Sequence, residues 1–513
     1  MGVGMRWGFD EYGRQPRLDR RPWAPEAMEA FGFDLWVHHY LPKASIQANR
    51  DEIREIDAWC GQRGMTWLLN VEDANWKAGF VDERGRDWYN QADGRHYFRF
   101  PDELLETLGA CQHLEGLLYD EAAHMQGCAN RMAEGIDQPW VYDPEARGDT
   151  LAEAADAFTG AVGELATLHA AHGIRLYTEH VFPVMYHGFA RAGWVAATKV
   201  LKENWSPAYL ACAMGAALQY GTPLWVTPDL WGMSGYPGHS VAEYRSALLL
   251  AYHLGADGLY TESFTYDHDK SGQGSLVHDR GDAYDVTPYG EVTRWFRQSY
   301  VPANPRGYTL RDLRPRVAII RQEDGCWGQA LSWLPDRLFG HRGWHSSSLT
   351  ESWLRVWHLL SRGVVPADSL SWHGGISQGT AHQLFCPLDG VVVYDHHVGA
   401  ERLEGVEAIF VVGLGVSPET LAAVEGAVAA GATCVIQPHL APPRVVAAKA
   451  ADGTLAQGAG RWVVQADPLA PAVRRAVAPL LPPRDVLRYQ FGDTTVTFSP
   501  VDGDSDRLEV SLT

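Results

Sequence analysis

The chain has 513 residues, of which 46% are hydrophobic and 21% are charged, and its formal net charge is −20. This length exceeds that of a usual single domain, and the composition excludes an intrinsically disordered chain. The acidic surplus argues against nucleic acid and anionic membranes as partners, because both attract clustered Lys and Arg.

Seven cysteines are scattered along the chain without CxxC spacing, which is typical of free thiols in a reducing compartment. The N-terminal stretch MGVGMRWGFDEYG lacks the basic and apolar regions of a signal peptide. No run of about 18 apolar residues follows it. We therefore expect a cytoplasmic protein without a membrane segment.

Short apolar stretches alternate with amphipathic helical stretches over about the first 300 residues. Eight of the apolar stretches are predicted strands: 5–11, 33–40, 66–73, 116–121, 174–180, 198–204, 223–229 and 258–263. Helical sequences such as SVAEYRSALLLAYHLGADG separate them and close on a Gly suited to a C-cap. Eight strands joined by helical crossovers predict an α/β fold, the (β/α)8 TIM barrel.

Each predicted strand carries Asp, Glu, His or Asn at or near its carboxyl end. These residues are Asp10, Glu11, His38, His39, Asn70, Glu72, Asp120, Glu121, Glu179, His180, Glu203, Asn204, Asp229 and Glu262. The carboxyl ends of the strands form one mouth in a TIM barrel, and active sites of this fold lie there. We therefore expect one polar site at that mouth.

The barrel is followed by a Pro- and Gly-containing connector, residues 301–315. From RVAIIRQEDG onward, a second βα pattern predicts a smaller flavodoxin-like or class I amidotransferase-like sheet. The tail alternates as a β hairpin would. The predicted domains are a catalytic barrel over 1–308, the α/β domain over 309–485 and a C-terminal β segment over 486–513.

Four stretches resemble the family 42 β-galactosidases of the clan-A glycoside hydrolases. They are the strand end at Glu121, YRSALLLAYHLGADGLY, TPYGEVTRWF, and RVAIIRQEDGCWGQ with AIFVVGLGVSPETLAAVEGAVAAGATCVI. The resemblance implies a TIM barrel joined to an amidotransferase-like trimerisation domain, and a carbohydrate or glycoside as substrate. It also implies a homo-oligomer, with a trimer as the inherited expectation.

The resemblance assigns Glu121 as the general acid/base, since the family has a Glu at the end of its fourth strand. The family's preceding Asn is Asp120 in this chain. The Glu that supplies the family's nucleophile after strand seven is absent, because Pro228 stands in its place with Asp229 next to it. Three residues could serve as the second carboxylate: Glu262, Asp229 and Glu203.

The remaining polar residues at the strand ends are expected to bind substrate hydroxyls, and aromatic residues nearby are expected to stack on a sugar ring. The polar set is Asp10, Glu11, His38, His39, Asn70, Glu72, Glu179, His180, Glu203 and Asn204, and the aromatic set is Trp225 and Trp231.

The sequence also suits three other functions. An Asp-Glu pair after strand four also occurs in substrate-assisted N-acetylhexosaminidases, where the Asp polarises a 2-acetamido group that attacks the anomeric carbon. Loss of the strand-seven Glu would also suit a non-catalytic sugar-binding barrel. A metal-dependent barrel enzyme could use His38, His39, Glu72, Glu179, His180 and Asp229, but their spacing matches no metal motif, and we expect neither a metal nor a cofactor.

Overall fold

The computed structural model describes residues 4–11, 17–76, 79–90, 95–128, 139–201, 205–230, 238–265, 274–325, 337–367 and 384–513. Within these ranges, no helix has both the length and the apolar character needed to cross a bilayer.

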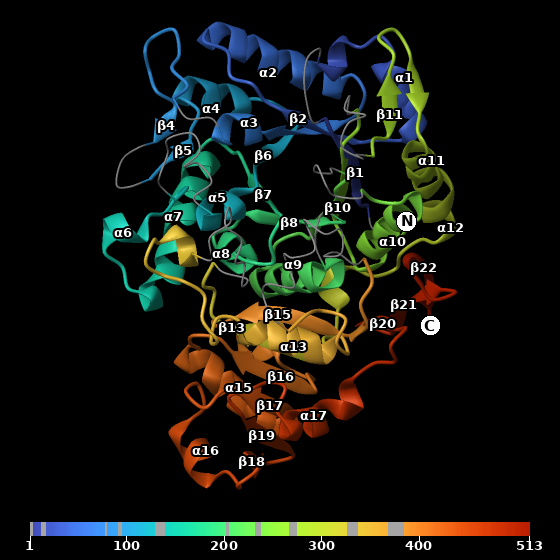
Figure 1. Cartoon of the computed structure of the whole chain (residues 1–513). Helices are drawn as coiled ribbons and strands as arrows, with labels where there is room; N and C mark the ends of the chain where they lie inside the picture. Colours follow the sequence, from blue (N-terminus) through green and yellow to red (C-terminus); the bar gives the residue numbers. More distant parts are fainter. Residues whose placement is uncertain are drawn as a thin grey trace.

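Eight parallel strands close into a barrel in the order β1-β10-β9-β8-β7-β6-β3-β2, as predicted (Figure 1). The strands are β1 (Arg6–Glu11), β2 (Leu35–His39), β3 (Thr66–Asn70), β6 (Leu114–Asp120), β7 (Leu176–His180), β8 (Val195–Val200), β9 (Trp225–Pro228) and β10 (Gly258–Glu262). The prediction for the sixth barrel strand, 198–204, was wrong in register, because β8 begins three residues earlier and ends at Val200. The polar residue near its carboxyl end is therefore Lys199.

Helices surround the barrel. They are α1 (Ala24–Phe31), α2 (Ile46–Gly61), α3 (Glu72–Trp76), α4 (Asp102–Gly109), α5 (Ala122–Cys128), α6 (Pro144–Arg147), α7 (Leu151–Ala170), α8 (Tyr186–Arg191), α9 (Ser206–Tyr220), α10 (Val241–His253), α11 (Pro288–Trp295) and α12 (Val301–Ala303). Local sequence sets several of their ends. Ser240 caps α10 by accepting a hydrogen bond from the Glu243 amide at 3.0 Å.

Side chains alternate between the inside and the outside of the barrel along each strand. The inner layers are apolar and aromatic, formed by Leu35, Val37, Leu68, Leu118, Tyr177, Val195, Ala197, Trp225 and Tyr260. These layers fill the barrel interior beneath the carboxyl ends, so a substrate can approach only from the mouth.

The second domain contains a six-stranded sheet in the order β15-β13-β16-β17-β19-β18. Its strands are β13 (Val317–Arg321), β15 (Val391–Asp395), β16 (Ala408–Val412), β17 (Thr433–Ile436), β18 (Thr454–Gln457) and β19 (Gly460–Val464), and its helices are α13 (Ser352–Leu360), α15 (Pro418–Ala430), α16 (Pro443–Ala448) and α17 (Pro471–Val477). The five parallel strands follow the flavodoxin-like order 2-1-3-4-5, with β18 as an antiparallel edge.

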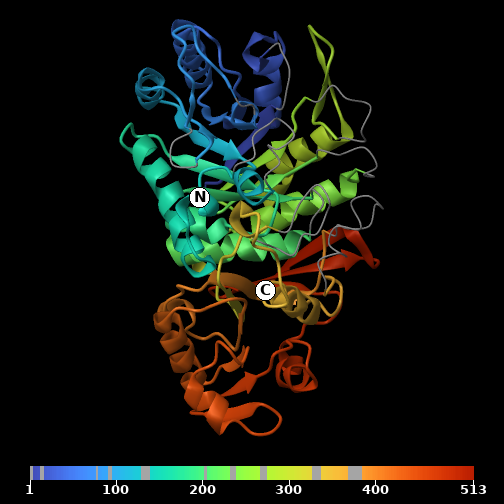
Figure 2. The ribbon, with the colours of Figure 1, turned by 60° about the vertical axis from the view of Figure 1, so that its left-hand side comes forward.

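The tail is larger than the predicted hairpin. Strands β20 (Leu487–Phe491), β21 (Thr494–Val501) and β22 (Asp504–Leu512) form an antiparallel meander, and β14 (Leu388–Asp389) extends it to four strands. Figures 1 and 2 both place this sheet at the junction between the barrel and the second domain. Ser246 of α10 donates to Asp506 O at 2.8 Å and accepts from Leu508 N at 2.9 Å, which attaches β22 to the barrel.

The barrel and the second domain pack closely along α9 and β15. A Cβ atom added to Gly215 of α9 would lie 1.7 Å from the carbonyl oxygen of Val393, so only glycine permits this approach. His187 Nε2 lies 2.9 Å from the same carbonyl. The two domains therefore share a continuous buried contact.

Candidate active site

Every barrel strand places one polar side chain inward in the layer nearest its carboxyl end. The ring consists of Asp10, His39, Asn70, Asp120, Glu179, Lys199, Asp229 and Glu262, and each member is at least nine-tenths buried. The strand register aligns its members, since Asp10 pairs with Glu262, His39 with Asn70, and Asp120 with Glu179. Seven of the eight were predicted as site residues.

Lys199 is the member that sequence reasoning missed. Its Nζ lies 2.7 Å from Glu262 Oε2, 3.0 Å from Glu179 Oε1 and 3.3 Å from Asp229 Oδ2. Glu121 Oε1 at 3.8 Å and Asp120 Oδ1 at 3.9 Å complete its surroundings. The available signal was a single charged residue in the apolar run WVAATKVL, because an interior lysine must find carboxylates.

The charges in this cluster perturb one another. Burial alone would lower the pKa of Lys199, but Asp120, Glu179, Glu262 and Asp229 outweigh it and raise that pKa well above its ordinary value. Lys199 is therefore an ammonium ion at neutral pH. Such a lysine has no lone pair for Schiff-base chemistry, so its role here is electrostatic.

Glu179 and Asp120 are almost completely buried acids of this cluster. Burial first, and the Asp120 carboxylate second, raise the pKa of Glu179 well above its ordinary value. The Tyr260 hydroxyl also donates to Glu179 Oε2. Burial likewise raises the pKa of Asp120, although Lys199 opposes the shift. Both groups hold a proton more readily than an exposed carboxyl would.

Glu121 faces the mouth. It follows β6 and has a φ of 53°, which is a left-handed backbone conformation. Its side chain therefore does not follow the regular alternation of inward and outward side chains along the strand. Its side chain is 12% exposed, against 1% for that of Asp120, and its Oε2 lies 3.2 Å from His124 Nδ1. Glu121 can therefore reach a bound molecule while Asp120 stays below it.

Of the three candidates for the second carboxylate, Glu262 is the best placed. Its side chain is 5% exposed and makes the shortest of the Lys199 contacts. The Asp229 side chain is 0% exposed and lies farther from Lys199 Nζ, at 3.3 Å. Glu203 and Asn204, together with Trp231, lie outside the described residues.

A second network lies beside the first. His39 Nε2 is 2.7 Å from Asp10 Oδ1, and His39 Nδ1 is 3.5 Å from Glu72 Oε2. Burial alone would lower the pKa of His39, but the charge and hydrogen bond of Asp10 outweigh it and raise that pKa to about 10. Burial, then the charge of Asp120, raises the pKa of Glu72 well above its ordinary value. This side of the mouth thus pairs an imidazolium with a carboxyl group that tends to stay protonated.

Asn70 joins the two networks. Its Nδ2 donates to Asp120 Oδ2 at 3.2 Å and approaches Asp10 Oδ2 at 3.4 Å, while its Oδ1 accepts from Glu72 N at 2.8 Å. The backbone bond fixes which end of the amide faces the acids. A donor group therefore points at Asp10 and Asp120.

This orientation bears on metal binding. Two groups of described residues place three ligand atoms close together: Asp10, His39 and Asp120 in the mouth, and Asp156, His396 and His397 at the domain junction. In the first group, the amide of Asn70 lies among the would-be ligands and the pKa of His39 favours the imidazolium. In the second group, the Asp156 carboxylate already forms an ion pair with Arg191. The residues of both groups are therefore better suited to forming hydrogen bonds and ion pairs than to binding a metal cation.

Three predicted substrate contacts lie outside the inward ring, because neighbouring positions of a strand face opposite sides. Glu11 accepts from Trp36 Nε1 at 3.1 Å, and His38 lies between Glu11 and Glu52. His180 is fully buried behind β7, where its ring stacks on Tyr186. The prediction that all residues at a strand end line the mouth is corrected accordingly.

The prediction that Trp225 stacks on a sugar ring is also corrected. The residue begins β9 rather than ending it, so its indole lies in the barrel interior, 3% exposed, with ring centroids 5.0 Å from Tyr177 and 6.2 Å from Tyr260. It supports the floor of the barrel and does not reach the mouth.

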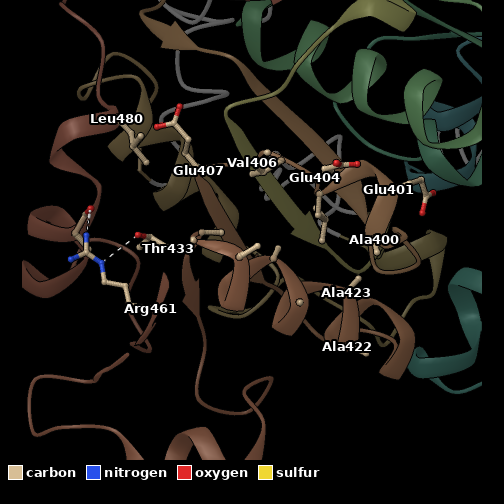
Figure 3. A pocket seen from close by; sticks show the side chains of 18 of the residues that line it. Ala400, Glu401, Glu404, Val406, Glu407, Ala422, Ala423, Thr433, Arg461 and Leu480 are labelled. Atoms are coloured by element: carbon tan, nitrogen blue, oxygen red, sulfur yellow. Dashed lines mark hydrogen bonds between the residues drawn. The ribbon is translucent and has the colours of Figure 1, made fainter. Parts of the chain in front are cut away.

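A groove of about 810 Å³ lies on the second domain, between the 400–407 segment and α15 (Figure 3). Small residues of α15, including Ala422, Ala423 and Gly426, form one wall. Arg461 lies at its end and donates to Thr433 Oγ1 at 3.3 Å. The groove contains no member of the polar ring, so the candidate active site remains the barrel mouth.

By sequence, the chain matches no protein-family model and no curated protein. By structure, it is similar to the exo-beta-1,4-mannosidase Op5Man5 from Opitutaceae bacterium strain TAV5, with a TM-score of 0.50 and 13% identity over 94% of this chain and 98% of that chain. At this identity the likeness shows a shared fold, which extends beyond the barrel into the second domain.

Two further structures are similar over part of the chain. The catalytic domain of beta-amylase from Paenibacillus polymyxa has a TM-score of 0.36 and 10% identity over 59% of this chain and 100% of that chain. A Bacteroidetes-affiliated GH5 cellulase has a TM-score of 0.36 and 10% identity over 60% and 95%. Fold and site together define a (β/α)8-barrel protein with a carboxylate-rich mouth, joined to a flavodoxin-like domain.

Proposed function

We propose that this protein is a glycoside hydrolase in which Glu121 is the general acid/base and Glu262 the nucleophile. The observation that carries the proposal is the meeting of both carboxylates at Lys199 Nζ, at 3.8 Å and 2.7 Å. Glycoside hydrolysis requires two carboxyl groups on either side of the scissile bond, one protonated and one ionised.

The two carboxyl groups have different surroundings, as the chemistry demands. The Glu262 carboxylate contacts the Lys199 ammonium directly, and such a contact favours its ionised form. Glu121 lies farther from that ammonium and nearer to solvent, where it can protonate a leaving oxygen and later activate water.

The contacts with Lys199 set an upper limit on the separation of the two contacting carboxylate oxygens, which bears on the stereochemical outcome. The two contacting oxygens can be no farther apart than the sum of their distances to Lys199 Nζ. That limit covers the about 5 to 5.5 Å of retaining enzymes and reaches only the lower edge of the about 6.5 to 9.5 Å range of inverting ones.

For the substrate, we propose a small β-glycoside. The sequence resemblance favours a β-galactoside, whereas one protein that is similar in structure over most of the chain is an exo-beta-1,4-mannosidase. The ring offers polar groups that can bind the hydroxyls of either sugar.

The substrate-assisted alternative has less support. It needs an Asp that reaches the 2-acetamido group, whereas the Asp120 side chain is 1% exposed and accepts a hydrogen bond from Asn70 at 3.2 Å. Activity on N-acetyl-β-hexosaminides that survives Glu262→Gln but is lost in Asp120→Asn would favour this mechanism instead.

A panel of aryl β-galactosides, β-mannosides, β-glucosides and N-acetyl-β-hexosaminides tests the proposal. We expect Glu121→Gln and Glu262→Gln each to reduce kcat by about 10²- to 10⁴-fold, and Asp229→Asn to cost less. Glu106→Gln, the same change at an exposed position of α4, is the matched control. Full activity of Glu121→Gln would overturn the assignment, and loss in Asp229→Asn alone would move the nucleophile to Asp229.

We further propose that the protein assembles through its second domain, with a trimer as the expectation from the sequence resemblance. Size-exclusion chromatography with multi-angle light scattering of the full chain at micromolar concentration tests this, and a monomer there would contradict it.

A further inference from the structure

Helix α5 begins directly after Glu121. Its first backbone hydrogen bond runs from Met125 N to Glu121 O, at 2.9 Å. His124, one turn along, contacts the Glu121 carboxylate at 3.2 Å. Any shift of α5 therefore moves both the proposed acid and the side chain that contacts it.

Gln126 ties this helix to two other segments. Its side chain is fully buried, and its Nε2 donates to Tyr142 O and to Phe339 O, both at 2.7 Å. Its Oε1 accepts from Tyr142 N at 3.2 Å. Both of its donor hydrogens are thus used, which gives the contact a defined geometry.

Phe339 belongs to the 338–340 segment, which lies between β13 and α13 of the second domain. The segment fits closely on α5. Gly340 has φ of +81°, and a Cβ atom there would lie 2.6 Å from Gln126 O. The Phe339 ring is fully buried against Tyr142 and Phe158, with centroids 6.1 Å and 5.8 Å away.

A neighbouring contact of the same loop anchors it to the barrel. Glu323, two residues after β13, accepts a hydrogen bond from Met185 N at 2.8 Å, just ahead of α8. The loop that follows β13 therefore contacts the barrel both at α5 and at the segment after β7. The second domain reaches the catalytic face through these hydrogen bonds between side chains and backbone groups.

We infer that Gln126 is a positioning residue through which the second domain holds the Glu121 carboxyl in place for proton transfer. The inference rests on the proposed function. General acid catalysis depends on placing the proton within hydrogen-bond reach of the leaving oxygen, so a small displacement of α5 weakens this step more than it weakens binding.

The test is the dependence of kcat/KM on the leaving group of a series of aryl glycosides. A 2,4-dinitrophenolate leaves without a proton, whereas a phenolate needs one. We expect Gln126→Leu to lower activity on phenyl glycosides by 10-fold or more and on dinitrophenyl glycosides by less than 3-fold. The basic limb of the pH profile, which reports the acid, should move as well.

Ser246→Ala is the matched control. Ser246 is also fully buried and also joins the barrel to a C-terminal strand, through Asp506 O and Leu508 N, but it lies on α10. We expect this variant to lower the melting temperature without changing the leaving-group dependence. Gly340→Ala, which disturbs the same contact from the other side, should reproduce the behaviour of Gln126→Leu.

The outcomes separate the two proposals. A wild-type protein that hydrolyses no glycoside of the series would remove the proposed function itself. If the wild type is active and Gln126→Leu lowers kcat/KM for all substrates by one common factor, the leaving-group dependence is unchanged, as expected for Ser246→Ala. The positioning role is then overturned. Should Gln126→Leu fail to fold, Gly340→Ala and the milder Gln126→Met are judged by the same criterion.

Discussion

Lys199 Nζ and Glu262 Oε2 lie 2.7 Å apart at the centre of the barrel mouth, with both side chains at most 5% exposed. This ion pair joins β8 to β10, two barrel strands that are separated by β9. It makes a single ammonium the common partner of carboxylates from several strands.

Lys199→Met should abolish most of the activity and change how stability depends on pH. Removing the ammonium leaves a cluster of buried carboxylates without their shared cation, which costs on the order of 3–5 kcal/mol unless they take up protons. The variant should therefore be closer to wild type at pH 5 than at pH 8, as measured by urea unfolding. Lys43→Met, at a 38% exposed lysine paired with Glu52, is the control and should show a much smaller effect. Equal losses at both pH values would argue against a role in balancing charge.

The raised pKa of His39 predicts a loss of stability toward alkaline pH. The pKa is about 10 in the folded protein against an ordinary 6.5, so the stabilisation is complete below pH 6.5 and is lost as pH rises through about 10. The free energy of unfolding should fall across this window by an amount on the order of a few kcal/mol. His39→Gln should make the free energy of unfolding less dependent on pH in this window. An unchanged pH dependence would show that His39 is neutral in the folded state.

His180 predicts the opposite dependence. Burial lowers its pKa to about 3, against the weaker opposing effect of its hydrogen bond with Val184 O. Between pH 6.5 and about 3, His180 is therefore protonated in the unfolded chain and neutral in the folded protein. The free energy of unfolding falls as the pH drops through this window. In His180→Gln this part of the acid sensitivity should disappear. Urea unfolding at pH 7 and pH 4.5 measures it, and an equal change with pH in wild type and variant would contradict the prediction.

Gly215→Ala should be strongly destabilising, because its Cβ would lie 1.7 Å from the backbone of Val393 and would separate α9 from β15. Overpacking of this kind typically costs about 1–3 kcal/mol or more. Gly160→Ala is the matched control, since Gly160 lies in α7 with nothing within 4 Å of an added Cβ. It should instead stabilise the helix by up to about 1 kcal/mol. Thermal unfolding distinguishes the two variants. Equal melting temperatures would show that α9 and β15 can move apart to accommodate the added methyl group without loss of stability.

The amino-acid sequence by itself determined the barrel and most of its polar ring. Strand and helix periods are local, and a parallel barrel brings all carboxyl ends to one mouth, so Asp10, Asp120, Asp229 and Glu262 could be placed together without coordinates. The same rhythm of strands and helices predicted a second α/β domain with a flavodoxin-like or amidotransferase-like sheet, and the structure has the flavodoxin-like strand order.

Tertiary structure decided which of these side chains meet. Strand register and alternation turn Glu179 inward and His180 outward, although they are neighbours in sequence. The central place of Lys199 depends on where β8 begins, which small residues such as Ala196 and Ala197 specify weakly. The contact of Gln126 with Phe339 joins positions 213 residues apart, and no local pattern carries such a pairing, because it arises only when two domains pack.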